Sequence, residues 1–188
     1  MSAATAGADG RLRCPWGNSA DDYVGYHDDE WGVPLHGEAA LYERLMLEAF
    51  QSGLSWLTIL RKRPAFRRAF AGFEPKLVAE FGDADVTRLM ADASIVRNRA
   101  KIDAAIRNAR AIADLDRPLD ELLWSFSPAA RPRPQTLAEV PAVTPESKAM
   151  AKELKRRGFA FVGPTTAYAL MQATGMVDDH VVGCWRAT

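Results

Sequence analysis

The chain has 188 residues, of which 48% are hydrophobic and 26% are charged, and its 24 basic and 24 acidic side chains leave no formal net charge. This composition is typical of a globular protein with room for a sizeable core, and it excludes a nucleic-acid binder that is basic over its whole surface, so any basic face must be local. No hydrophobic run reaches the roughly 18–20 residues of a membrane span, and we expect no membrane partner.

The first ten residues, MSAATAGADG, are small and mostly polar. They lack the basic start and the hydrophobic stretch of a secretory signal, so we expect a disordered tail over residues 1–10 and a cytoplasmic protein. The chain has only two cysteines, which argues against a disulfide scaffold. We expect one domain over residues 11–188.

Helical periodicity recurs along the chain and strand signals are almost absent, which predicts an all-α fold of many short helices. Residues 38–53 place Leu41, Leu45 and Phe50 on one side of a helix that Gly53 ends. The five prolines of residues 127–145 predict an extended crossing loop. Further helices are expected from Ser55 to about Lys62, from Pro64, from Pro75, and over residues 84–91, 97–114, 119–126, 146–157 and 164–174.

Two glycines bound a short turn in residues 153–175, ELKRRGFAFVGPTTAYALMQATG. Gly158 is a natural cap for the first helix, Gly163 ends the turn, and Pro164 suits the first position of the next helix. Backbone N–H groups in such a turn can hold a phosphate. An ordinary helical hairpin with a solvated basic end would show the same pattern. The basic residues on the approach are Lys152, Lys155, Arg156 and Arg157.

The two cysteines and two of the three histidines form two pairs near opposite ends of the chain. Cys14 precedes His27, and His180 precedes Cys184 by four positions. Two cysteines and two histidines form a usual tetrahedral set for structural zinc, which would tie the two ends together. Four separate buried residues, or a Cys14–Cys184 disulfide, would account for the same pattern.

Aromatic residues are dense near the N-terminus, where Trp16, Tyr23, Tyr26 and Trp31 are followed by Trp56. Such rings can surround a flat or cationic ligand, although they more often fill a core. Glu48 lies at the edge of the hydrophobic face of helix 38–53. It could point into a cavity or form a surface ion pair with Arg44, and the helical wheel alone favours the surface pair.

Seven segments, taken in order, resemble the 3-methyladenine DNA glycosylase I family, which are bacterial repair enzymes of the helix-hairpin-helix superfamily. They extend from about Arg13 to Cys184, so the resemblance covers nearly the whole chain. The chain departs from the family pattern in its longer N-terminal tail. The segments are RCPW, YHDDEWGVP, LEAFQSGLSW, IVRNRAKI, WSF, KRRGFAFVG and DDHVVGC.

The resemblance implies a site for each part of the activity. Zinc would be bound by Cys14, His27, His180 and Cys184. The base would be held by Glu48, Tyr26 and Trp56, with Trp16, Tyr23 and Trp31 as walls. A helix-hairpin-helix at about residues 146–174 would bind DNA through Gly158, Gly163, Lys155, Arg156 and Arg157. The family lacks the catalytic aspartate of its superfamily, so Asp178 and Asp179 receive no catalytic role.

The implied activity is hydrolysis of the N-glycosidic bond of 3-methyladenine in double-stranded alkylated DNA after base flipping. Free 3-methyladenine would be the product, and no lyase step would follow. The methylated base is cationic and already a good leaving group, so an aromatic pocket and the Glu48 carboxylate would favour it over neutral adenine. We expect a monomer with one structural zinc, and Gln51 or Leu54 as the wedge that fills the vacated stack.

Two alternatives belong to other classes of protein. A non-catalytic zinc-containing module that binds damaged DNA would keep the metal and the hairpin, but Glu48 in its expected position weighs against it. A zinc hydrolase acting on small molecules would need an open metal position, which two cysteines and two histidines do not leave.

Overall fold

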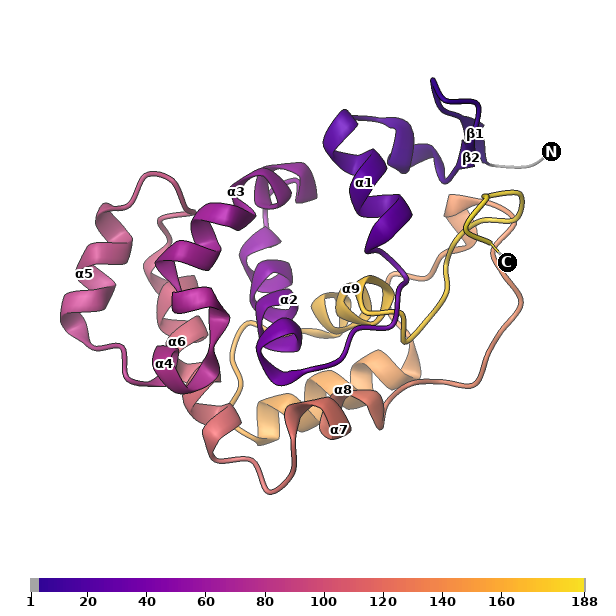
Figure 1. Ribbon diagram of the computed structural model, residues 1–188. Coiled ribbons are helices and arrows are strands. Elements are labelled where there is room, and N and C mark those ends of the chain that lie inside the picture. Colours follow the sequence, from indigo (N-terminus) through magenta and orange to yellow (C-terminus); the bar gives the residue numbers. More distant parts are fainter. Residues whose placement is uncertain (1–3, 188) are drawn as a thin grey trace.

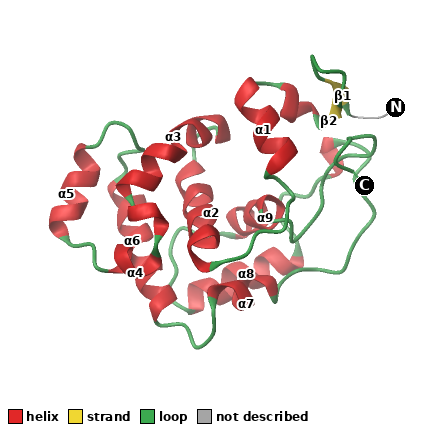
Figure 2. Cartoon of the chain, in the orientation of Figure 1, coloured by secondary structure: helices red, strands yellow, loops and turns green. Residues whose placement is uncertain are grey.

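The structure is a computed structural model that describes residues 4–187, and helices form most of it (Figures 1 and 2). This confirms the predicted all-α class, apart from one two-stranded sheet near the N-terminus. None of the helices in the described part of the chain has the length and hydrophobicity needed to cross a bilayer. The helices are α1 (Asp21–Asp29), α2 (Glu38–Gln51), α3 (Trp56–Ala69), α4 (Pro75–Ala79), α5 (Asp83–Ala91), α6 (Arg99–Ala113), α7 (Leu119–Trp124), α8 (Pro145–Arg156) and α9 (Pro164–Ala173).

Helix α2 lies at the centre of the fold and packs against α3, α6, α7 and α9 (Figure 1). Residues 41–50 of this helix are all buried, including three charged side chains, Glu43, Arg44 and Glu48. The hydrophobic face predicted for residues 38–53 is therefore confirmed, but the opposite face of the helix is also covered. A helix that is buried all round must give each charged side chain a partner or a function.

Helix α3 runs unbroken through Pro64, where the sequence predicted the start of a separate helix. Proline inside a helix removes one hydrogen bond and costs roughly 3 kcal/mol. The residues around it, Ile59, Ala65 and Phe66, are buried in the core. This burial keeps the helix continuous, so the prediction of two short helices was wrong.

The N-terminal residues are more ordered than predicted. Strand β1 (Thr5–Ala6) pairs antiparallel with strand β2 (Leu12–Arg13). The side chain of Asp9 accepts hydrogen bonds from two nitrogens of Arg13, at 2.8 and 2.6 Å. The predicted disorder is therefore wrong for the paired residues of this segment, while residues 1–3 lie outside the described part.

The N-terminal sheet and the C-terminal segment up to residue 187 lie side by side (Figure 1). The backbone N–H of Trp185 donates to the carbonyl of Leu12 at 2.7 Å, which joins the C-terminal segment to β2. The long loop after α7 was predicted as an extended crossing and contains only one short 3-10 turn, η3 (Leu137–Glu139). It leads into α8, which the turn of residues 157–163 connects to α9.

Candidate active site

A cavity of about 460 Å³ collects the aromatic residues that are scattered over the N-terminal sequence. All six residues predicted for base binding and catalysis line it, which places α1, the end of α2 and the start of α3 around one space. The remaining lining residues are Gln51 at the end of α2 and residues of the loop before α8, of α9 and of the segment that follows it. The six predicted residues are Trp16, Tyr23, Tyr26, Trp31, Glu48 and Trp56.

The aromatic rings of the cavity support one another through edge and tilted contacts. The ring of Trp16 meets Tyr23 edge-on at 5.6 Å and Trp31 at 5.0 Å between centroids. Tyr26 and Trp56 lie 5.3 Å apart with a tilt of 46°. Such pairs hold each ring in one orientation, which leaves rigid aromatic surfaces around the cavity.

Glu48 brings the only acidic group of α2 that lines this cavity. The residue is 7% exposed, and within residues 4–187 no hydrogen bond or ion pair reaches its carboxylate. Burial raises the pKa of Glu48 to about 7, while the positive charge of Arg44 lowers it. A buried carboxylate without a partner is unfavourable for the fold and is typical of a functional group.

The surface ion pair between Arg44 and Glu48 that the helical wheel favoured does not form. Arg44 is 6% exposed and donates to the hydroxyl of Tyr26 at 3.0 Å and to the carboxylate of Glu30 at 3.1 Å. Tyr26 of α1, Glu30 and the neighbouring α3 cover this face of α2. The wheel was wrong because it assigns a side chain to a face of the helix but cannot show what covers that face.

The sequence analysis missed the wall that α9 and the following segment contribute. Tyr168, Gln172 and Asp179 all line the cavity. The carboxylate of Asp179 accepts from Tyr168 at 2.5 Å, from Gln172 at 2.8 Å and from Arg131 at 2.5 Å. Three donors occupy this carboxylate, so it holds the wall together.

The loop before α8 forms a further wall that the sequence analysis did not predict. Leu137, Val140, Pro141 and Ala142 line the cavity, and Gln51 lines it at the end of α2. Leu54 lies in the turn between α2 and α3 and is 41% exposed. Of the two predicted wedge residues, Gln51 therefore borders the cavity and Leu54 projects into solvent.

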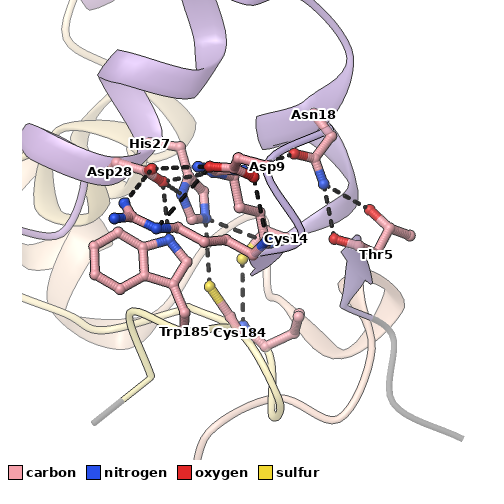
Figure 3. A network of polar contacts seen from close by, with 11 residues as sticks. Thr5, Asp9, Cys14, Asn18, His27, Asp28, Cys184 and Trp185 are labelled. Atoms are coloured by element: carbon pink, nitrogen blue, oxygen red, sulfur yellow. Dashed lines mark hydrogen bonds and ion pairs between the residues drawn. The ribbon is translucent and has the colours of Figure 1, made fainter. Parts of the chain in front are cut away.

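Three of the four predicted metal ligands converge beside the N-terminal sheet (Figure 3). The ligand atoms of Cys14, His27 and Cys184 are buried and lie within 4.8 Å of one another. Both cysteines are free thiols, so the alternative of a Cys14–Cys184 disulfide is not adopted. The alternative of separate buried residues also fails, because segments from both ends of the chain bring the three residues together.

The neighbours of these residues fit metal ligation. Nδ1 of His27 lies 2.8 Å from the carboxylate of Asp28, which leaves Nε2 facing the cysteines (Figure 3). Nδ1 of His180 lies 2.9 Å from Asp178, and its buried Nε2 has no hydrogen-bond partner among the described residues. The His180 ring lies 5.1 Å from that of His27. A histidine that bonds a carboxylate through one nitrogen and offers the other is the usual form of a zinc ligand.

Gly32 explains how the ring of His180 reaches this position. Its φ of +77° lies in the left-handed region, and a Cβ there would meet the His180 ring at 2.7 Å. Only glycine fits both conditions without strain. The glycine of the YHDDEWGVP segment is therefore explained by close packing at the cluster.

The turn between α8 and α9 has the geometry that its glycines predicted. Gly158 has a φ of +93°, and the N–H groups of Gly158 and Phe159 donate to Lys155 and Leu154, as in a Schellman cap. Gly163 is the N-cap of α9, and a Cβ there would meet no atom within 4 Å. Backbone at Gly163 is therefore open to approach from outside.

The predicted basic residues of α8 separate onto two sides of the helix. Lys148, Lys152 and Lys155 join Arg107 and the turn along one groove. Arg156 bonds Glu153, and Arg157 bonds both Glu153 and Asp116. We therefore keep Lys152 and Lys155 in the candidate DNA surface and add Lys148 and Arg107, which the sequence analysis had not selected. Arg156 and Arg157 are left out.

Comparison with known proteins places this architecture in a family. The model of the methyladenine glycosylase family matches residues 16–187, which is nearly the whole chain. The chain belongs to the methyladenine glycosylase family. The family expected from the seven sequence segments is thereby confirmed.

Individual members of the family match over most of their length. The chain is 46% identical over 180 residues to DNA-3-methyladenine glycosylase 1 of Escherichia coli K12, covering 92% of this chain and 95% of that protein. It is 42% identical to DNA-3-methyladenine glycosylase of Haemophilus influenzae, with 92% and 96% covered. The 3-methyladenine DNA glycosylase I of Staphylococcus aureus, solved for its 3-methyladenine recognition, has a TM-score of 0.88 at 33% identity, covering 94% of this chain and 96% of that one.

Proposed function

We propose that this protein is a DNA glycosylase that releases 3-methyladenine from alkylated double-stranded DNA without a lyase step. The observation that carries the proposal is the cavity in which aromatic rings surround the unpartnered carboxylate of Glu48. The family membership and the relatives named for this activity support it. The substrate base, flipped out of the stack, would enter this cavity.

The side chains of the cavity suit a cationic base that is already a good leaving group. The rings of Tyr26 and Trp56 would hold its plane, and Trp16, Tyr23 and Trp31 would form the outer walls. An aromatic face attracts a cation by roughly 0.5–2 kcal/mol, which neutral adenine lacks. The ionised carboxylate of Glu48 would accept a charge-assisted hydrogen bond from the base and stabilise its positive charge. Water would then attack the sugar carbon as the base departs.

DNA would dock on the turn between α8 and α9 as a helix-hairpin-helix. The open backbone at Gly163 and the N-terminus of α9 would hold a phosphate, and the left-handed cap at Gly158 sets the course of the turn. Lys148, Lys152, Lys155 and Arg107 line the adjoining groove. Contacts of this kind fix the protein on DNA without reading its sequence.

One structural zinc would join the ends of the chain through Cys14, His27, His180 and Cys184. The orphaned Nε2 of His180 and the convergence of the other three ligands support this set. Four protein ligands leave no open position, so the metal would stabilise the fold and take no part in the reaction. The monomeric state, the cytoplasmic location and the single domain over residues 11–188 stay predictions.

Incubation of the purified protein with methylated duplex DNA, followed by chromatography of the released bases, tests the proposal. We expect 3-methyladenine to be released and the strands to stay intact until the abasic sites are cleaved with alkali. Unmethylated duplex is the control. Tight binding to methylated DNA without release of any base would favour the non-catalytic module, and strand cleavage without alkali would contradict the absence of a lyase step.

A further inference from the structure

Arg44 is a buried cation that the reaction proposed above does not use. Its side chain spans two partners, with Nη1 donating to the hydroxyl of Tyr26 at 3.0 Å and Nη2 to Oε2 of Glu30 at 3.1 Å. It stands one helical turn before Glu48 on α2. Residues four apart on a helix are neighbours, so the positive charge of Arg44 also acts on the Glu48 carboxylate.

The position of Arg44 is itself fixed by a second arginine. Arg63 of α3 donates to both oxygens of Glu30, at 2.5 and 2.7 Å, and the paired geometry orients that carboxylate. Two guanidinium groups therefore share one carboxylate, which leaves one positive charge uncompensated. The group of four residues becomes neutral only when Glu48 is ionised.

The contact with Tyr26 also sets the direction of its hydroxyl. A phenol oxygen that accepts a hydrogen bond from a guanidinium still has its own hydrogen to donate. Arg44 can only donate, so it cannot take that hydrogen. The O–H of Tyr26, whose ring packs against Trp56, is thus left as a donor for a guest in the cavity.

We propose that Arg44 is a positioning residue for the base site, which presents the Tyr26 hydroxyl as a donor and places a positive charge one helical turn from the Glu48 carboxylate. The inference rests on the proposed function of Glu48 and Tyr26. The other titratable groups that line the cavity are Tyr23 of α1, Tyr168 of α9 and Asp179, and Asp179 is already paired with Arg131. Among residues 4–187, Arg44 is the one cation whose charge acts on the Glu48 carboxylate.

Single-turnover excision measured against pH tests this role. The methylated base is cationic throughout, so the acidic limb of the profile reports on the protein. In the wild type, the rate should fall as the pH falls through about 7, where Glu48 takes up a proton. Arg44→Met should move this limb upward by about one pH unit, which slows excision about tenfold at low pH. Near pH 9, where Glu48 is ionised in both proteins, the rate of the variant should still lie below that of the wild type, because the Tyr26 hydroxyl has lost the donor that orients it.

Two further variants distinguish a specific role of Arg44 from a general loss of structure. Arg44→Lys keeps the positive charge, so the acidic limb should return to its wild-type pH. The ammonium group cannot bond Tyr26 and Glu30 at once, so the rate at high pH should stay reduced. Arg67→Met removes an ion pair between α3 and Glu43 of α2, away from Tyr26 and Glu48, and should leave the limb unmoved. Thermal unfolding of each variant accompanies the rates.

Each outcome decides the inference. A uniform rate loss with an unmoved limb in Arg44→Met, or a limb that Arg44→Lys does not restore, would overturn it. Glu48→Gln distinguishes this failure from a failure of the proposed site. If Glu48→Gln removes the acidic limb of the pH profile while Arg44→Met leaves it at its wild-type position, the proposed role of Arg44 is wrong and the proposed role of Glu48 stands. If Glu48→Gln excises with the wild-type rate and profile, the proposed site itself is wrong.

Discussion

The α2 wall of the cavity and the C-terminal segment of residues 178–184 each contain a buried carboxylate, but the two carboxylates differ in their hydrogen-bond partners. On α2, the carboxylate of Glu48 is buried with no hydrogen-bond partner in the described chain. In the C-terminal segment, Asp179 is 1% exposed and accepts from three donors. Both carboxylates line the same cavity.

This difference separates a group kept for a ligand from a group kept for the fold. An unpartnered buried carboxylate costs stability in the free protein and gains its partner when a cationic base binds. A carboxylate with three donors gains little from a ligand, and its removal leaves those donors unpaired. His180 and Cys184, in the same segment, resemble Glu48 in this respect. The Nε2 atom of His180 has no hydrogen-bond partner in the described chain, and Cys184 lies beside two other proposed metal ligands.

Removal of one proposed metal ligand should produce the largest effect. Cys184→Ser is expected to lower stability by several kcal/mol, since structural zinc contributes roughly 10–16 kcal/mol in zinc-finger peptides. Metal analysis and thermal unfolding measure this. Wild-type protein treated with a strong chelator should show the same loss, and the variant should be insensitive to the chelator. A wild-type protein that is stable and free of metal would contradict the prediction.

Asp179→Ala should destabilise the fold by about 3–5 kcal/mol, the usual cost of breaking a buried ion pair from one side. Tyr168, Gln172 and Arg131 would each lose a partner. Urea unfolding measures the change. Asp116→Ala, which breaks an exposed pair with Arg157, is the matched control and should cost no more than about 1 kcal/mol. Equal losses of stability for the two substitutions would show that the buried Asp179 network contributes no more than an exposed ion pair.

Glu48→Gln should slow excision of 3-methyladenine by roughly ten- to a hundredfold, because a charge-assisted contact worth about 1.5–3 kcal/mol is lost. Single-turnover kinetics on methylated duplex measure the rate. Glu43→Gln, on the same helix but paired with Arg67, is the control and should excise normally. Binding to undamaged DNA should change in neither variant. A normal rate for Glu48→Gln would show that Glu48, like Asp179, has no role in binding the base.

The same substitution should raise stability at pH 8. The pKa of Glu48 is about 7 in the folded protein against 4.5 for the ordinary group, so the folded state binds this proton more tightly. The resulting stabilisation is complete below pH 4.5 and is lost as the pH rises through 7. At about 1.4 kcal/mol per pKa unit, Glu48→Gln should gain up to roughly 3 kcal/mol at pH 8.

Urea unfolding of the wild type and of Glu48→Gln at pH 5 and pH 8 measures this gain. The difference between the two proteins should shrink at the lower pH. Glu43→Gln should lose stability under the same conditions, because its carboxylate is paired with Arg67. A destabilised Glu48→Gln variant at pH 8 would show that the carboxylate has a partner in solution.

The smallest effect is expected on the basic helix α8. Lys155→Ala should weaken binding to any duplex and reduce the slope of log affinity against log salt by about 1, the value for one lost phosphate contact. Arg156→Ala is the matched control, because that side chain is paired with Glu153 and lies outside the groove. Fluorescence anisotropy over a salt series measures both. Equal slopes for the two variants would argue against the groove as the DNA surface.

Local patterns in the sequence were sufficient for most of the helices and for the turn. The hydrophobic spacing of residues 38–53 predicted α2, and Gly158 with Pro164 predicted the turn between α8 and α9. These features depend on neighbours a few positions away, which the sequence displays directly. Pro64 misled for the complementary reason, because the packing of Phe66 in the core keeps α3 continuous.

The pairing of the two ends illustrates what residue types can and cannot predict. Two cysteines and two histidines predicted a shared cluster, and Cys14, His27 and Cys184 do converge. The sheet of residues 5–13 was missed, since strands of two residues carry no usable pattern. Its stability comes from Asp9 with Arg13 and from contact with the C-terminal segment.

The amino-acid sequence determined that Glu48 lies at the edge of the hydrophobic face of a helix, and family resemblance gave it a role. Only the tertiary structure decided its environment. Arg44, one turn away, was the obvious partner on the wheel, but Tyr26 and Glu30 take its hydrogen bonds. The charge state of a carboxylate depends on burial and on charges brought by other segments, and neither is encoded within one turn of its own helix.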